Sequence, residues 1–325
     1  MKIDIINATI LKELLKDGRK SFAEIAKECN TSKDVIAKRY KQMKSKGIIV
    51  GATIQNSCAC YGCGLVAGIY IYTQPHKADH VLQLVHKIPQ VFDVYSVGIN
   101  PSLVATVVMK NIEELDQVKQ SIKKLPFISG VDTKVWTGVR NMPENLSILT
   151  PQETALKTDN ENRKTKSNLE KTAAKIDEID KQIIEKLAAN ARMPFMKIAK
   201  AMKVSTDTVV RRYERLKQNG DLKVVIQINP IKIGYYAYAT FSIAFISQDS
   251  LVDSTEALAK IPDINNIIKT SGNFDYTISL MVRDIEQLTT IQEEIVNIPG
   301  ITNMEIAVEK LFNVWPLPRE FISTF

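Results

Sequence analysis

The sequence SKDVIAKRYKQMKSKG, residues 32–47, has two different faces when it is read as a helix. Ile36, Tyr40 and Met43 recur at helical spacing and form a narrow apolar stripe. Lysine and arginine cover most of the remaining surface. An apolar stripe lets a helix dock on its own domain, whereas a basic outer face suits a polyanion. We therefore interpret this stretch as the recognition helix of a helix-turn-helix domain.

A second stretch of the same kind follows at residues 205–220, STDTVVRRYERLKQNG. Its apolar stripe consists of Val209, Tyr213 and Leu216, and its outer face is again basic. The net charge of +7 concentrates around the two stretches: residues 4–51 have an excess of five positive charges and residues 177–224 an excess of four. The rest of the chain is slightly acidic, so the localisation favours a nucleic-acid partner for these two segments.

The chain contains an internal repeat. A shift of 173 positions brings the chain onto itself without a gap, from Lys2-Ile3-Asp4 on Lys175-Ile176-Asp177 to Pro143 on Pro316. Chance similarity would not hold one register for so long, so the sequence predicts two copies of one unit. Residues 145–174 between the copies are polar and poor in large apolar side chains, which is typical of a linker.

Each copy begins with signals for three short helices and a strand. In copy one, Asp4 can cap a first helix, and the spacing from Ser21 to Glu24 is that of a capping box for a second. The basic helix follows, Gly47 ends it, and the β-rich residues 48–55 come next. This order predicts a winged helix-turn-helix.

The second part of each copy alternates strand and helix patterns in the order βαββαβ, which predicts a ferredoxin-like α/β sandwich. The fold class expected is therefore α+β, with two tandem winged helix-turn-helix plus ferredoxin-like units. The open face of each sheet is rich in Ile, Tyr and Phe and should pair with another sheet, within one chain or between chains. The expected divisions are a winged helix-turn-helix at 1–57, a ferredoxin-like domain at 58–144, a linker at 145–174, a second winged helix-turn-helix at 175–230, and a second ferredoxin-like domain with a C-terminal tail at 231–325.

This order resembles the Lrp/AsnC, or feast/famine, family of transcriptional regulators. The resemblance rests on IDEIDKQIIEKLAANARMPFMKIAKAMKVSTDTVVRRYERLKQNGDL, residues 176–222, on its weaker counterpart in copy one, and on SGNFDYTISLMV, residues 271–282. It implies DNA binding, an effector domain that takes an amino acid or a similar small molecule, and assembly into homodimers or larger oligomers. The duplication departs from the family, whose members usually carry one unit per chain.

Residues on the N-terminal part of a recognition helix meet base edges, and more distal cations meet phosphate. The base-reading candidates are Lys33, Asp34, Val35, Lys38, Thr206, Asp207, Thr208 and Arg211. The phosphate candidates are Arg39, Lys41, Lys44, Arg212, Arg215 and Lys217. The alternative is that these are solvated helix faces. Arg19 and Arg192 either reach phosphate or pair with a nearby acid. Because the two reading surfaces differ, we expect two unlike half-sites in double-stranded DNA.

The family resemblance places an effector site at Gly272, Asn273, Asp275 and Tyr276, where a carboxylate can accept an ammonium group and backbone N–H groups a carboxylate. The alternative is a structural turn. In copy one the aligned residues 99–102 lack the carboxylate, and Pro101 removes a donor. We therefore expect copy one to have lost or changed its ligand.

Cys58, Cys60 and Cys63 lie close together in copy one. They could bind a soft metal or respond to oxidation, but copy two carries Ile231, Ile233 and Tyr236 at these positions, which favours packing. We expect no resident metal and no cofactor.

The leading hypothesis is a regulator rather than an enzyme, because copy two has no histidine for acid–base chemistry and an enzyme would not need the basic helices. We expect it in the cytoplasm, because the N-terminus lacks a signal peptide and no apolar run could span a membrane. Two alternatives stay open. Sirohaem decarboxylases resemble this family and work as paired homologous subunits, so the chain could be a fused enzyme pair. A small-molecule sensor without DNA binding is the other.

Overall fold

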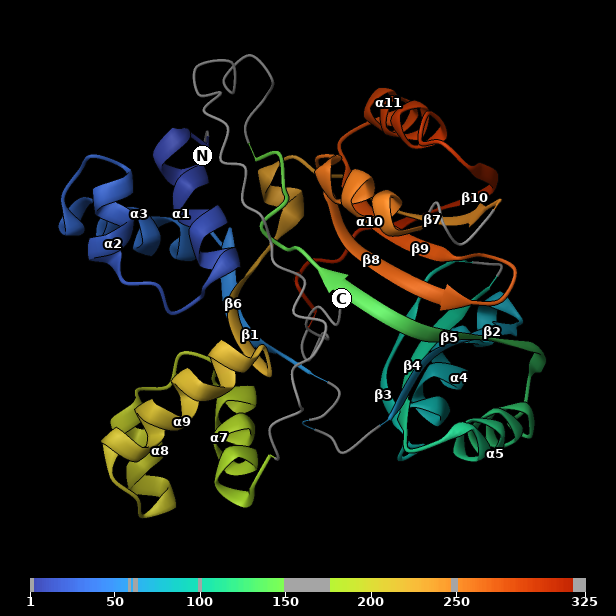
Figure 1. The fold of residues 1–325 in the computed structure, drawn as a ribbon, viewed down its shortest axis with the longest axis horizontal. Helices are drawn as coiled ribbons and strands as arrows, with labels where there is room; N and C mark the ends of the chain where they lie inside the picture. Colours follow the sequence, from blue (N-terminus) through green and yellow to red (C-terminus); the bar gives the residue numbers. More distant parts are fainter. Residues whose placement is uncertain are drawn as a thin grey trace.

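The computed structural model describes residues 3–57, 60, 64–98, 101–148, 176–246 and 251–317. The chain forms two winged helix-turn-helix domains on one side and two effector domains on the other (Figure 1). Most of the expected linker and the last eight residues lie outside the described part.

Each helix-turn-helix domain has the three helices that its capping residues predict. Copy one forms α1 (Ile5–Lys16), α2 (Phe22–Glu28) and α3 (Lys33–Ser45). Copy two forms α7 (Glu178–Ala189), α8 (Phe195–Met202) and α9 (Thr206–Asn219). Asp4 accepts a hydrogen bond from the N–H of Asn7 at 2.9 Å, and Ser21 with Glu24 completes a capping box. These local bonds satisfy amides that a helix start would otherwise leave unpaired.

The strands after the recognition helices are exchanged between the two domains. β1 (Ile49–Asn56) and β6 (Leu222–Ile228) form one antiparallel sheet, with Thr53 opposite Val225. Ile54 of β1 is buried in the core of copy two, whereas Ile226 and Ile228 of β6 are buried in the core of copy one. Each wing therefore completes the hydrophobic core of the other copy.

Both effector domains have the predicted βαββαβ order. Copy one consists of β2 (Leu65–Thr73), α4 (Ala78–Val85), β3 (Val91–Ser96), β4 (Leu103–Met109), α5 (Ile112–Lys123) and β5 (Ile128–Asn141), with the 3-10 turn η2 (Pro75–Lys77) before α4. Copy two has the 3-10 turn η3 (Pro230–Ile233), then β7 (Ala237–Phe245), α10 (Leu251–Lys260), β8 (Ile264–Ser271), β9 (Tyr276–Val282), α11 (Ile285–Val296) and β10 (Ile301–Lys310).

The two effector domains pair within the chain. Their strands form one eight-stranded sheet in the order β10-β7-β9-β8-β5-β2-β4-β3. The antiparallel seam between β5 and β8 runs from Val135 opposite Ser271 to Asn141 opposite Asn266. Helices α5 and α11 lie at opposite outer sides of this body, with the strands between them (Figure 1). The sequence left open whether the sheets meet within or between chains, and the β5–β8 ladder decides it.

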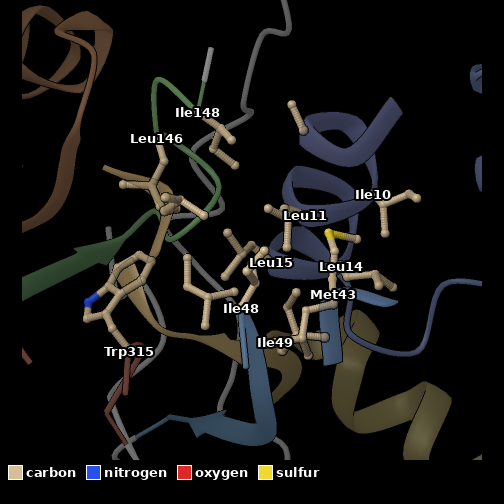
Figure 2. Close-up of a cluster of buried hydrophobic side chains, with 14 of the residues drawn as sticks. Ile10, Leu11, Leu14, Leu15, Met43, Ile48, Ile49, Leu146, Ile148 and Trp315 are labelled. Carbon is tan, nitrogen blue, oxygen red and sulfur yellow. The ribbon is translucent and has the colours of Figure 1, made fainter. Parts of the chain in front are cut away.

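One hydrophobic cluster ties the first helix-turn-helix domain to the second effector domain. Leu11 and Leu15 of α1 and Ile48 pack with Leu146 and Trp315, which come from the segments after β5 and β10 (Figure 2). Each of these side chains is at most 2% exposed. Full burial of one such side chain stabilises the fold by roughly 1.5–3 kcal/mol, so this contact fixes the two domains to one another.

Candidate nucleic-acid interface and effector site

The outer face of α3 is open to solvent. Ile36 and Met43 are fully buried and dock the helix on its domain. The four base-reading candidates of copy one are all exposed, namely Lys33, Asp34, Val35 and Lys38. Farther along the same face, Lys41 and Lys44 are also exposed. Among the described residues, none of these four lysines takes part in an ion pair.

The outer face of α9 is arranged in the same way but presents fewer cations. Thr206, Asp207 and Arg211 are exposed. Thr208 is half-buried, and its hydroxyl lies 2.8 Å from that of the N-cap residue Ser205. Three of the four base-reading candidates of copy two are therefore fully available to a partner, and the fourth contributes to the helix cap.

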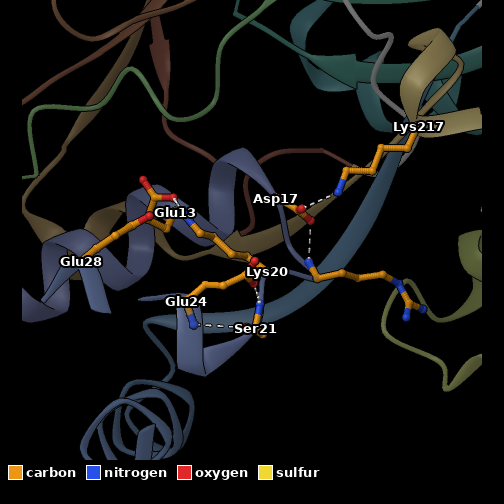
Figure 3. A network of polar contacts seen from close by, with 8 residues as sticks. Glu13, Asp17, Lys20, Ser21, Glu24, Glu28 and Lys217 are labelled. Atoms are coloured by element: carbon orange, nitrogen blue, oxygen red, sulfur yellow. Dashed lines mark hydrogen bonds and ion pairs between the residues drawn. The ribbon is translucent and has the colours of Figure 1, made fainter. Parts of the chain in front are cut away.

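Four of the six phosphate candidates are held in ion pairs inside the chain. Arg39 pairs with Asp4 at 2.6 Å, and Lys217 crosses to Asp17 of the other copy at 2.7 Å (Figure 3). Arg212 pairs with Asp177 and Asp180, and Arg215 also pairs with Asp180. Exposed pairs of this kind contribute about 0–1 kcal/mol, so a phosphate could displace them. Asp180 is fully buried, which ties the two arginines of α9 more firmly.

The hydrogen bonds in these pairs favour the charged forms. Burial raises the pKa of Asp4, but the Asn7 N–H and the Arg39 guanidinium outweigh it, and the net pKa is lowered. The hydrogen bond to Asp177 raises the pKa of Arg212. The Asp4 carboxylate and the Arg212 guanidinium are therefore both held in their charged forms.

Arg19 and Arg192 each contact the other helix-turn-helix domain, which the sequence did not predict. Arg19 donates to the carbonyls of Ala191 at 3.1 Å and Met193 at 2.6 Å, and its guanidinium lies 4.3 Å from the centroid of the Phe195 ring. Arg192 lies 5.1 Å from the centroid of the Tyr40 ring. The sequence holds one sign of this contact, because the two arginines are equivalent in the repeat and each lies three residues before a phenylalanine, Phe22 or Phe195.

The effector loop of copy two is built as a tight turn. Gly272 has φ of +143°, a conformation that favours glycine, and Asn273 is exposed. The Asp275 carboxylate accepts a hydrogen bond from the Phe245 N–H at 2.8 Å. Tyr276 is 1% exposed, and its hydroxyl lies 2.7 Å from that of Thr255. Asp275 thus bridges two strands, and Tyr276 lies in the domain core.

The aligned turn of copy one is only partly described, since Ile99 and Asn100 lie outside the described residues. Ser102 is fully buried and donates to the carbonyl of Thr73 at 3.0 Å. The described part of this turn therefore contributes to the strand framework.

Of the clustered cysteines, Cys60 is buried, and its thiol lies 3.3 Å from the carbonyl oxygen of Asp221. Burial raises the pKa of this thiol, which disfavours the thiolate that a metal would need. Cys58 and Cys63 lie outside the described residues. Within the described part of the chain, no three metal-ligating side chains gather at one point.

A cavity of about 120 Å³ lies between the open faces of the two effector domains. Residues from both copies line it, among them Tyr70, Tyr95, Trp136, Tyr238 and Glu309. None of the four effector candidates of the Gly272 loop does. The cavity is therefore a separate feature of the effector domains.

Comparison with known protein families follows the same division of the chain. A model of the AsnC-type helix-turn-helix domain matches residues 176–217, and the Lrp/AsnC ligand binding domain matches twice, at residues 66–138 and 238–309. The chain belongs to the Lrp/AsnC family. A winged helix-turn-helix DNA-binding model also matches residues 3–50. Both copies of the unit are thus recognised, as the repeat predicts.

Relatives in this family match one copy each. The HTH-type transcriptional regulator LrpA of Pyrococcus horikoshii is 33% identical over 140 residues, which is 42% of this chain and 99% of the relative. An uncharacterised HTH-type transcriptional regulator of Pyrococcus abyssi is 31% identical over 152 residues, 45% of this chain and 93% of the relative. The chain is therefore an Lrp/AsnC-type transcription regulator with helix-turn-helix DNA-binding domains.

A solved structure also matches the arrangement of both copies. The crystal structure of the siroheme decarboxylase NirDL superimposes with a TM-score of 0.59 at 15% identity, covering 98% of this chain and 93% of that one. This likeness shows a shared fold. Within the described residues of this Lrp/AsnC protein, no helix is long and apolar enough to cross a membrane.

Proposed function

We propose that the chain binds double-stranded DNA sequence-specifically through α3 and α9, which act as a pair of recognition helices within one chain. The exposed and unpaired lysines of α3 support this most directly, because a helix face with free cations and a buried opposite stripe matches a groove-binding helix. Lys33 and Lys38 are placed for base edges, and Lys41 and Lys44 for phosphate. The exchanged wings hold the two helices in one fixed relation.

The two recognition helices bind different base sequences in this proposal. The exposed N-terminal residues are Lys33 and Asp34 on α3 but Thr206 and Asp207 on α9. Lysine and threonine make different hydrogen bonds with base edges. The natural site therefore consists of two unlike half-sites, and binding-site selection should return an asymmetric sequence rather than a palindrome.

The DNA-binding proposal is tested by fluorescence anisotropy on a selected duplex. Replacement of Lys38 and Lys41 by Gln should weaken binding by at least about tenfold and flatten its dependence on salt. The control replaces Lys123 and Lys124, which are exposed on the effector domain, by Gln and should leave both unchanged. Equal affinity for the two double variants would contradict the proposal. If binding-site selection with the wild type returns no sequence at all, the result favours a sensor without DNA binding.

The effector in this proposal is an amino acid, held at the turn formed by Gly272, Asn273 and Asp275. The open turn offers backbone N–H groups to a carboxylate, and Asp275 has one oxygen besides the one that Phe245 occupies. Tyr276 supports the turn from the core. Amino acids that raise the melting temperature of the wild type but not of Asp275→Asn would support this site, and equal shifts in both would count against it.

Two chains associate further in this proposal, through effector-domain surfaces outside the β5–β8 seam. The β5–β8 ladder already joins the two sheets edge to edge within one chain. Light scattering coupled to size-exclusion chromatography gives the number of chains in solution, and a mass of 36.5 kDa would show a monomer.

A fused sirohaem decarboxylase is the enzymatic alternative. The acidic residues Asp93 and Glu309 line the central cavity, and no lysine, arginine or histidine of the described chain does. Sirohaem carries several carboxylates, which such a lining disfavours, and a volume of about 120 Å³ suits a far smaller molecule. Titration with sirohaem under anaerobic conditions, followed by its absorption spectrum, tests this alternative directly.

A further inference from the structure

The central cavity combines aromatic rings with a carboxylate. Phe312 makes edge contacts with Tyr95 at 5.8 Å and with Tyr238 at 5.5 Å between ring centroids. Tyr70 and Trp136 line the same space. Burial raises the pKa of Tyr70 to about 12, and it also raises the pKa of Tyr95 well above its ordinary value. These phenols therefore stay neutral, and the cavity is walled by uncharged rings.

Glu309 supplies the negative charge. Its carboxylate lines the cavity and makes no hydrogen bond or ion pair with any described residue. Asp93, which also lines the cavity, accepts a hydrogen bond from the N–H of Val94. The Lys134 ammonium group lies 4.8 Å from the centroid of the Tyr70 ring and donates a hydrogen bond to the Ser242 hydroxyl. Among the residues that the structure describes, no cation pairs with Glu309 inside the cavity.

A further acceptor points to a ligand with hydrogen-bond donors. The side-chain oxygen of Asn266 is buried in the cavity wall without a hydrogen-bond partner among the described residues. The Thr277 hydroxyl also lines the cavity, beside the Tyr70 hydroxyl with which it interacts. Buried polar atoms are rarely left unpaired, because an unmade hydrogen bond leaves the loss of their hydration uncompensated. A donor-bearing molecule inside the cavity would satisfy the Asn266 oxygen.

We propose that this cavity binds a small protonated primary amine, with Glu309 as its counter-ion and Asn266 as a hydrogen-bond acceptor. An ammonium group has three donors and no acceptor, which matches the cavity wall. Tyrosine and tryptophan faces attract such a cation as well. The amine carries a short alkyl chain and no carboxylate, because a carboxylate would meet Asp93 and Glu309.

The size of the cavity limits the ligand. A protein cavity of about 150 Å³ holds benzene, which has six non-hydrogen atoms. A volume of about 120 Å³ therefore fits a molecule of about five such atoms. n-Butylammonium meets this limit, and butan-1-ol is a neutral probe of the same length. Tetramethylammonium has the same number of non-hydrogen atoms and the same charge but no donors.

The test is calorimetric titration of the full chain at pH 8 with these three probes. n-Butylammonium should bind at least about tenfold more tightly than either of the others, a ratio that corresponds to 1.4 kcal/mol. Glu309→Gln should lose at least about tenfold in affinity for n-butylammonium. Glu305→Gln removes the same charge from the same strand at an exposed position outside the cavity and should bind like the wild type.

Several results would overturn the proposal. These are equal binding of n-butylammonium and butan-1-ol, unchanged affinity in Glu309→Gln, or no binding of any probe, which would leave water as the occupant. Glu309→Gln removes a half-buried charge and should fold at least as well as the wild type, which circular dichroism checks. The proposal does not depend on DNA binding, so the two can fail separately.

Discussion

The two helix-turn-helix domains follow the same path but use their charges differently. In copy two, the buried Asp180 of α7 holds Arg212 and Arg215 of α9. In the repeat register, copy one has Asn7 in place of Asp180 and Gln42 in place of Arg215. Copy one therefore has no buried ion pair at this point, and its recognition helix displays free lysines instead. The chain has two similar scaffolds, one in which cations stabilise the domain and one in which they face outward.

The largest expected effect comes from breaking the buried pair of copy two. Asp180→Asn leaves two arginines without their shared carboxylate and should lower the free energy of unfolding by about 3 kcal/mol. Asn7→Ala at the equivalent position of copy one removes no charge and should cost about 1 kcal/mol or less. Urea denaturation followed by circular dichroism measures both. Equal costs would show that the two domains do not differ in this way.

A pH dependence distinguishes Glu309 from its counterpart in copy one, Trp136. Burial raises the pKa of Glu309 from its ordinary value of 4.5 to about 7. Between these values the folded chain holds a proton that the unfolded chain has released, so stability is full below about pH 4.5 and falls as pH rises through about 7. From pH 5 to pH 8 the loss should be about 2 kcal/mol.

Glu309→Gln should remove this loss and make the protein more stable than the wild type at pH 8. Urea midpoints at pH 5 and pH 8 for the wild type, Glu309→Gln and Glu305→Gln measure it. If Glu309→Gln keeps the same pH dependence as the wild type, Glu309 does not titrate in this range.

The reciprocal arginines offer a smaller contrast. Arg19→Ala removes two hydrogen bonds to carbonyls and a ring contact, and it should cost about 2 kcal/mol. Arg192→Ala removes ring contacts and should cost about 1 kcal/mol. Thermal or urea unfolding of the two variants ranks them. A larger loss of stability in Arg192→Ala than in Arg19→Ala would contradict this ranking.

The smallest effect concerns DNA. Lys41→Gln and Lys44→Gln should each reduce the slope of binding against salt by about one unit, because each removes a free cation. Arg215→Gln and Lys217→Gln should reduce it less, since Asp180 and Asp17 already neutralise these side chains. Anisotropy at four salt concentrations gives the slopes. Equal slopes for all four variants would show that the ion pairs open on DNA binding.

Much of the architecture could be predicted from local patterns. The repeat gave two copies of the unit, and the caps at Asp4 and Ser21 gave two helix starts, because a cap is a contact between residues three apart. The βαββαβ order followed from periodicity, and the structure confirms it in both copies. The proposed base contacts and the effector turn stay predictions.

Other features depend on residues far apart in the chain. The wing exchange pairs Thr53 with Val225, and Arg19 reaches Met193. No local pattern specifies such partners. The acidic partners of Arg212 and Lys217 were missed for the same reason, although Asp180 and Asp17 were visible in the sequence.

The sequence by itself determined the duplicated unit, the helices with their basic faces and the family, because periodicity, capping and composition act over a few residues. Only the tertiary structure decided that the sheets join through β5 and β8 within the chain, that Asp180 ties the arginines of α9, and that a carboxylate and aromatic rings enclose one cavity. These depend on which surfaces exclude water together, and that is a property of the whole folded chain.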